Sequence, residues 1–192
     1  MSAVKVGILA LQGDVREHRQ VLESLGVEVR QVRLAAELEG LSGLVIPGGE
    51  STTMSRLIQR FDLLSPLQEA FAGGLAALTT CAGTILAARE IRDGLPDQVR
   101  LELLDIVVRR NAFGRQRESA EVLLEVPAVG NEPVPVAFIR APAIEEVGPG
   151  VEVLASYRDE PAAVRQGRHL ALTFHPEITG DPRLHRLFLS GL

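Results

Sequence analysis

Short apolar runs alternate with amphipathic stretches along the first half of the chain, and this alternation limits the possible folds more than any other feature. Runs typical of strands cover residues 4–11, 27–32, 44–46 and 76–80. Between and after them, apolar side chains at helical spacing predict helices over residues 15–24, 53–60, 66–72 and 83–89. Strands that alternate with helices predict an α/β fold. In it, a mostly parallel central sheet is flanked by helices on both faces, giving three layers.

The second half of the chain favours strands. Six further strands are predicted, over residues 101–108, 121–126, 134–139, 151–157, 162–165 and 170–174. A final helix is predicted over residues 181–189. The chain has 192 residues and shows no internal repeat, low-complexity segment or domain linker, so we expect one domain over residues 1–192.

Composition and charge exclude several classes of protein. The net charge is −5, which argues against nucleic acid as the main partner. No apolar run approaches the roughly 18 residues that span a membrane, and no signal peptide is recognisable. The single cysteine excludes an intramolecular disulfide and a multi-cysteine zinc site, and it fits a reducing compartment. We therefore expect a cytoplasmic protein that does not act at a membrane.

Polar and small residues follow four of the predicted strands. The sequence Gln12-Gly13-Asp14 follows the first, PGGESTT at residues 47–53 follows the run 44–46, Cys81 follows residues 76–80, and His175 follows residues 170–174. Ligands of open α/β sheets bind at the carboxyl ends of the strands. We therefore expect a glycine loop, a thiol and an imidazole to meet at one edge of the sheet.

Each of these residues also has a simpler interpretation. A lone cysteine is most often a small buried hydrophobe, and a Gly-Gly pair after a strand is most often a turn. A histidine before proline is usually a surface or loop residue. His18 and His185 on predicted helices, and His169 in a polar turn, are expected to pack or to face solvent. The arginine-rich stretch at residues 109–117 is also compatible with a solvated surface.

The combination nevertheless suits nucleophilic catalysis. Cys81 stands where a strand meets a helix, on the kind of turn that exposes a nucleophile. His175 can accept and return a proton, and Glu177 can orient the imidazole if the segment is extended, since residues i and i+2 then share one side. Backbone N–H groups at Gly48 and Gly49 can stabilise an oxyanion. The implied reaction class is acyl transfer through a thioester.

Several motifs also carry a family resemblance. PGGEST at residues 47–52, TCAG at 80–83 and FHPE at 174–177 resemble the triad-type, class I glutamine amidotransferases, which have a flavodoxin-like fold. LALQGD at 9–14, RRNAFGRQ at 109–116 and FIRAP at 138–142 narrow the similarity to the glutaminase subunits of pyridoxal 5′-phosphate synthase. The motifs occur in the family's order along nearly the whole chain.

The resemblance implies a role for each matching residue. Cys81 would be the nucleophile, His175 the general base and acid, and Glu177 the orienting carboxylate. The glutamine-binding residues would be Gly48, Gly49, Glu50, Ser51, Ala82, Arg110, Ile139 and Arg140. Glutamine carries both charge signs, and the guanidinium groups of this set suit its carboxylate while the Glu50 carboxylate suits its ammonium.

The resemblance also implies a reaction and a partner. Such subunits hydrolyse L-glutamine to glutamate and ammonia, and the ammonia passes to a (β/α)8-barrel synthase subunit within a large hetero-oligomer. Neither a metal nor an organic cofactor is implied for the glutaminase itself. Because ammonia released to water is lost, we expect docking of the partner to activate the site, with the loop Gln12-Gly13-Asp14 as the sensor.

One residue departs from the family pattern, and two alternatives stay open. The family usually has glycine two residues before the cysteine, where this chain has Thr79. We expect the turn to form nevertheless, because threonine suits the end of a strand. The chain could instead be the glutaminase of another amidotransferase or a γ-glutamyl hydrolase. It could also be a non-catalytic scaffold module of the same fold.

Overall fold

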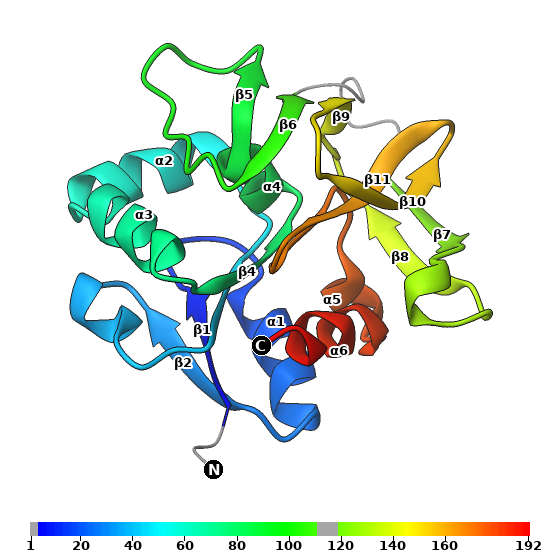
Figure 1. Ribbon diagram of the computed structural model, residues 1–192, viewed down its shortest axis with the longest axis horizontal. Coiled ribbons are helices and arrows are strands. Elements are labelled where there is room, and N and C mark those ends of the chain that lie inside the picture. Colours follow the sequence, from blue (N-terminus) through cyan, green and yellow to red (C-terminus); the bar gives the residue numbers. More distant parts are fainter. Residues whose placement is uncertain (1–3, 111–118) are drawn as a thin grey trace.

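A computed structural model describes residues 4–110 and 119–192 and has a large central sheet between two layers of helices (Figure 1). Its seven strands are β1 (Lys5–Leu9), β2 (Glu28–Val32), β3 (Gly43–Ile46), β4 (Ala76–Thr80), β10 (Glu152–Tyr157), β11 (Glu160–Gln166) and β12 (His169–Leu172). Their spatial order is β10-β11-β12-β4-β3-β1-β2. The five strands from β12 to β2 pair in parallel, and the pairs at β11 are antiparallel. The carboxyl ends of β1, β3, β4 and β12 therefore lie along one edge.

Helices cover both faces of this sheet (Figure 1). They are α1 (Val15–Ser24), α2 (Ser51–Arg60), α3 (Leu64–Ala72), α4 (Ala82–Ala87) and α6 (Arg183–Ser190). Alternate strand residues face opposite ways: Val6 and Ile8 pack in one core with α1 and α6, while Leu9 packs in the other with α2, α3 and α4. Burial on both faces is what parallel strands require.

Smaller elements complete the described part of the chain. Strands β5 (Ala88–Arg92), β6 (Leu104–Arg109) and β9 (Ala143–Val147) form a second sheet, and β7 (Ala120–Leu124) pairs with β8 (Val134–Phe138). The short helices are η1 (Ala35–Leu38), η2 (Pro127–Val129) and α5 (Pro176–Thr179). A backbone pairing of Ala137 with His175 ties β8 to the start of α5.

The structure confirms the α/β class with its mostly parallel sheet and corrects some boundaries. The helix expected over residues 83–89 ends at Ala87, because the chain leaves it at Ala88 to pair with Leu104 of β6. Strand β9 and helix α5 were not predicted. His169 begins β12 and packs edge-on against Phe71, so it does not lie in a polar turn. None of the helices in the described ranges is long and apolar enough to cross a membrane.

Candidate active site

Cys81 lies on a sharp turn between β4 and α4. Its backbone has φ +45° and ψ −104°, a conformation that costs a non-glycine residue about 1–3 kcal/mol. The amide of Cys81 donates to the Leu172 carbonyl of β12 at 2.9 Å, which fixes the turn to the sheet. Two residues on, a Cβ at Gly83 would lie 2.1 Å from the Ile46 carbonyl oxygen, so the helix can pass β3 this closely only with glycine.

The turn forms with Thr79 in place. This side chain is fully buried, and its hydroxyl lies 2.8 Å from that of Thr84 on α4. Because Thr84 donates its hydroxyl hydrogen to the Leu172 carbonyl at 2.7 Å, Thr79 must be the donor to Thr84. The threonine is therefore accommodated as a buried strand residue whose polar atom is satisfied.

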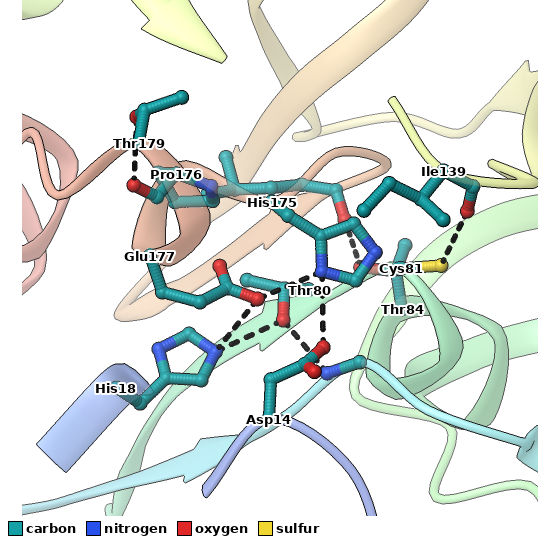
Figure 2. A network of polar contacts seen from close by, with 12 residues as sticks. Asp14, His18, Thr80, Cys81, Thr84, Ile139, His175, Pro176, Glu177 and Thr179 are labelled. Atoms are coloured by element: carbon teal, nitrogen blue, oxygen red, sulfur yellow. Dashed lines mark hydrogen bonds and ion pairs between the residues drawn. The ribbon is translucent and has the colours of Figure 1, made fainter. Parts of the chain in front are cut away.

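His175 and Glu177 form a close pair beside this turn (Figure 2). The Nδ1 atom of His175 lies 2.7 Å from Oε1 of Glu177 and 3.2 Å from Oδ2 of Asp14. The hydrogen bond between His175 and Glu177 is present as expected. The backbone conformation expected for this segment was wrong. His175 caps α5, and Glu177 lies in the first turn of that helix, so a helix start rather than an extended segment brings the two together.

The protonation of His175 follows from these neighbours. Burial alone would lower the pKa of His175, but hydrogen bonds with Asp14, Cys81 and Glu177 outweigh burial and raise the pKa to about 12. The imidazole therefore carries a proton at neutral pH.

Asp14, His175 and Glu177 also present donor atoms within 4.8 Å of one another, a set that could hold a metal ion. The hydrogen bond between His175 and Glu177 already uses the nitrogen that such an ion would need.

The glycine loop after β3 packs against the loop after β1. The Glu50 amide donates to Oε1 of Gln12 at 2.7 Å. A Cβ at Gly13 would lie 1.7 Å from the Gly48 carbonyl oxygen, and one at Gly48 would lie 2.3 Å from Cε1 of His175. Glycine at both positions allows the two loops and the imidazole to pack in contact.

Two backbone amides remain available to an anion near Cys81. The Gly48 amide donates to Oγ1 of Thr80 at 2.9 Å and is therefore occupied. The Gly49 amide has no hydrogen-bond partner among the described residues. Ala82 is the first residue of α4, and the first N–H groups of a helix have no partner within it. Of the two glycines predicted as oxyanion donors, Gly49 is thus the one whose amide is free.

A cavity of about 420 Å³ opens over the cysteine. Such a volume lies within the usual range of small-molecule sites, roughly 300–1,000 Å³. Most of the residues predicted for the site line this cavity. Gly48 and Glu177 do not line it and lie next to residues that do. Its lining consists of Gln12, Asp14, Gly49, Glu50, Ser51, Cys81, Ala82, Ile85, Arg110, Ile139, Arg140 and His175.

Charges of both signs border this cavity. Nη2 of Arg140 lies 3.0 Å from Oε1 of Glu50, and both side chains are about half exposed. Arg110 also lines the cavity, but residues 111–116 of the predicted RRNAFGRQ motif lie outside the described residues. The Ile139 carbonyl lies 3.8 Å from the Cys81 sulfur.

Sequence reasoning missed three features around the site. The Asp14 contact with His175 was not expected, although Asp14 lies in the loop that follows the first strand. Ile85 lines the cavity from the second turn of α4, with no signal beyond its apolar character. Thr80 and His18 contact each other beneath the site at 3.1 Å. The alternation of strand residues could have placed Thr80 on the α1 side of the sheet.

The parallel sheet and its cysteine-bearing turn are those of the class I glutamine amidotransferases. The family model described as the SNO glutamine amidotransferase family matches residues 8–192, and the chain belongs to this family. A relative in Parafrankia sp. (strain EAN1pec), named pyridoxal 5′-phosphate synthase subunit PdxT, is 57% identical over 99% of this chain and 94% of its own length. The protein of that name in Pelotomaculum thermopropionicum is 55% identical, over 97% of this chain and 94% of its own.

Solved structures agree with this assignment. One described as a glutamine amidotransferase superposes with a TM-score of 0.90 at 51% identity, covering 96% of this chain and 97% of its own. The structure of PurLQS from Thermotoga maritima has a TM-score of 0.71 at 18% identity, covering 100% of this chain and 98% of its own, and shows a shared fold alone.

Proposed function

We propose that the chain is the glutaminase of a pyridoxal 5′-phosphate synthase and hydrolyses L-glutamine to L-glutamate and ammonia for vitamin B6 biosynthesis. The observation that carries the proposal is the position of Cys81. It lies on a strained turn at the floor of a cavity that His175 also lines, with Glu177 hydrogen-bonded to the far side of the imidazole. The PdxT relatives point to the same activity.

The reaction proceeds through a thioester in this proposal. Cys81 attacks the side-chain amide carbon of glutamine as the thiolate, with its proton held on His175, and the resulting oxyanion accepts hydrogen bonds from the Ala82 and Gly49 amides. His175 gives its proton to the amide nitrogen, the C–N bond breaks and ammonia leaves. A water molecule then attacks the thioester while His175 accepts its proton. The C–S bond breaks, and glutamate and free Cys81 are restored.

Charged groups around the cavity select the amino acid. Arg110 and Arg140 bind the α-carboxylate of glutamine, and Glu50 binds its ammonium. Because Arg140 and Glu50 pair with each other at 3.0 Å in the free protein, substrate binding exchanges one ion pair for two. Gly48 and Ser51 hold the glycine loop against the substrate. The side-chain amide of glutamine is thereby directed to the cysteine.

The partner is a pyridoxal 5′-phosphate synthase barrel subunit, which receives the ammonia within a large cytoplasmic hetero-oligomer. The contact of Gln12 with the Glu50 amide supports gating through the first loop, because movement of Gln12 would release an amide beside the oxyanion site. We expect glutamine turnover to be slow in the isolated chain and to rise when the barrel subunit docks. A scaffold function or a different amidotransferase partner would give no such rise.

Covalent capture tests the proposal. A diazoketone analogue of glutamine should alkylate Cys81 in the complex with the barrel subunit, adding one label per chain by mass spectrometry. Excess L-glutamine should protect the cysteine, whereas D-glutamine should not. Labelling elsewhere, or labelling that L-glutamine does not slow, would contradict the assignment of Cys81 as nucleophile.

A further inference from the structure

Two buried histidines lie behind the proposed catalytic residues. His18 of α1 and His185 of α6 are both 0% exposed, and Nδ1 of His18 lies 3.0 Å from Nε2 of His185. The other nitrogen of His18, Nε2, lies 3.1 Å from Oγ1 of Thr80 and 3.5 Å from Oε1 of Glu177. Figure 2 shows His18 on the opposite side of the Glu177 carboxylate from His175. A polar chain thus extends from α6 to the active site.

Burial decides the charge of both rings. It lowers the pKa of His18 well below its ordinary value and the pKa of His185 to about 4. Both imidazoles are therefore neutral at neutral pH, and each carries one N–H group. A neutral ring donates one hydrogen bond and accepts one, so the neighbours determine where each proton resides.

The unpartnered Nδ1 atom of His185 indicates which nitrogen of that ring carries the proton. Its Nδ1 is buried and has no hydrogen-bond partner among the described residues. An orphaned N–H donor is rarer in protein interiors than an unsatisfied acceptor, so the proton resides on Nε2. That Nε2–H donates to Nδ1 of His18.

The second proton follows from the first. Because Nδ1 of His18 accepts a hydrogen bond, its proton resides on Nε2, which faces Thr80 and Glu177. The opposite arrangement would point the His18 lone pair at a carboxylate oxygen and leave a buried N–H on His185 without a partner. Both consequences are unfavourable, so one arrangement of the two rings is favoured.

We infer that His18, held in this tautomer by His185, is a positioning residue for the proposed glutaminase reaction. Its N–H acts on Glu177, which orients His175, and on Thr80, which accepts the hydrogen bond of the Gly48 amide at 2.9 Å. The N–H group of neutral His18 thereby positions two groups. One is the Glu177 carboxylate behind the His175 imidazole, and the other is the glycine loop against which that imidazole packs. This inference rests on the proposed function.

Two variants of His18 separate the donor from simple packing. Glutamine reproduces the position of Nε2 and asparagine that of Nδ1. His18→Gln should keep most of the glutaminase kcat in the complex with the barrel subunit, because it retains an N–H toward Thr80 and Glu177. His18→Asn should lower kcat about tenfold or more with little change in KM, since it removes the hydrogen bond to Thr80 and the N–H group that faces the Glu177 carboxylate at 3.5 Å.

The outcomes are distinguishable from a failure of the proposed function. If the wild-type complex released no glutamate, the proposed function would be wrong. If it did, and both variants lost kcat in proportion to their loss of thermal stability, His18 would be a packing residue. Nitrogen NMR of the isolated wild-type chain gives an assay-independent check: His18 and His185 should both show protonated Nε2 and bare Nδ1. A protonated Nδ1 on His18 would overturn the inference.

Discussion

Asp14 places a second carboxylate beside His175. Its Oδ2 atom lies 3.2 Å from Nδ1 of the imidazole, on the open side of the site, whereas Glu177 is fully buried. Both carboxylates raise the pKa of His175 against the effect of burial. Both carboxylates therefore stabilise the protonated imidazole. Of the two, Asp14 is the one that solvent and substrate can reach.

Removing this charge should change the pH profile. Asp14→Asn lowers the pKa of His175, so the proton for the leaving ammonia is lost at a lower pH. The alkaline limb of kcat/KM in the complex should move down by about one pH unit. Glu17→Gln, which removes a nearby carboxylate on α1, is the control and should leave the limb in place. An unmoved limb in Asp14→Asn would show that Asp14 does not act on His175.

Thr79 stands where the family resemblance led us to expect glycine, and its hydrogen bond to Thr84 stabilises the end of β4. Thr79→Gly removes the donor to Thr84 and adds backbone freedom in β4, so the free energy of unfolding should fall by about 2 kcal/mol. Glutaminase turnover should stay within about twofold, because the Cys81 turn is fixed by Leu172 and Gly83. Thr79→Ser, which keeps the hydroxyl, should lose less stability. A severalfold rise in turnover on Thr79→Gly would show that the threonine handicaps the enzyme.

Among the strands and helices, the spacing of apolar residues predicted those elements whose conformation is set by their own sequence. The alternation of apolar runs placed β1, α1, β4 and α6 within a few residues of their observed bounds. The first two residues of strand β5 were predicted as helix because they continue the pattern of α4, and only pairing with β6 stops that helix. Helix α5 is a single short turn, and His175, the residue before it, pairs with Ala137 of β8. Such long-range pairing leaves no local signal.

The same distinction applies to the site. Residues that follow strands, such as Cys81 and His175, were predictable because the sheet gathers strand ends at one edge. The residues beneath them were not predictable in the same way. His18 meets Thr80 because α1 packs on the face of β4 to which Thr80 points, and that register becomes visible only in three dimensions.

The packing of α4 on β3 depends on one missing side chain. Gly83→Ala would place a Cβ 2.1 Å from the Ile46 carbonyl and push α4 away from the sheet. The free energy of unfolding should fall by roughly 3 kcal/mol, and kcat should fall because Cys81 precedes the helix. Gly191→Ala is the control, since its nearest neighbour atom lies at 3.5 Å, and should change stability by less than about 0.5 kcal/mol. Equal denaturant midpoints for the two variants would contradict this packing argument.

For the molecule as a whole, buried histidines link stability to pH. The folded pKa of His185, about 4, lies below its unfolded value of about 6.5, so the unfolded chain binds the extra proton as the pH falls between them. His185 therefore contributes about 3 kcal/mol to the free energy of unfolding above pH 6.5. This contribution is lost as the pH falls toward 4.

Denaturant titrations across this range test the linkage. His185→Gln cannot titrate, so its unfolding free energy should fall less than that of the wild type between pH 6.5 and 4. The difference between the two chains reports His185 together with its effect on His18, whose pKa His185 also lowers, and it removes the common contribution of the more distant titrating groups. Parallel curves for the two chains would show that His185 titrates alike in both states.

In the proposed function, Cys81 is the nucleophile of a glutaminase that works with a synthase partner. The most direct measurement is glutamate release from L-glutamine by the wild type and by Cys81→Ala, each with and without the pyridoxal 5′-phosphate synthase barrel subunit. We predict slow release by the wild type alone, a clear rise with the partner, and no release by Cys81→Ala in either case. Release by Cys81→Ala, or binding of the partner with no release by the wild type, would contradict this role of Cys81.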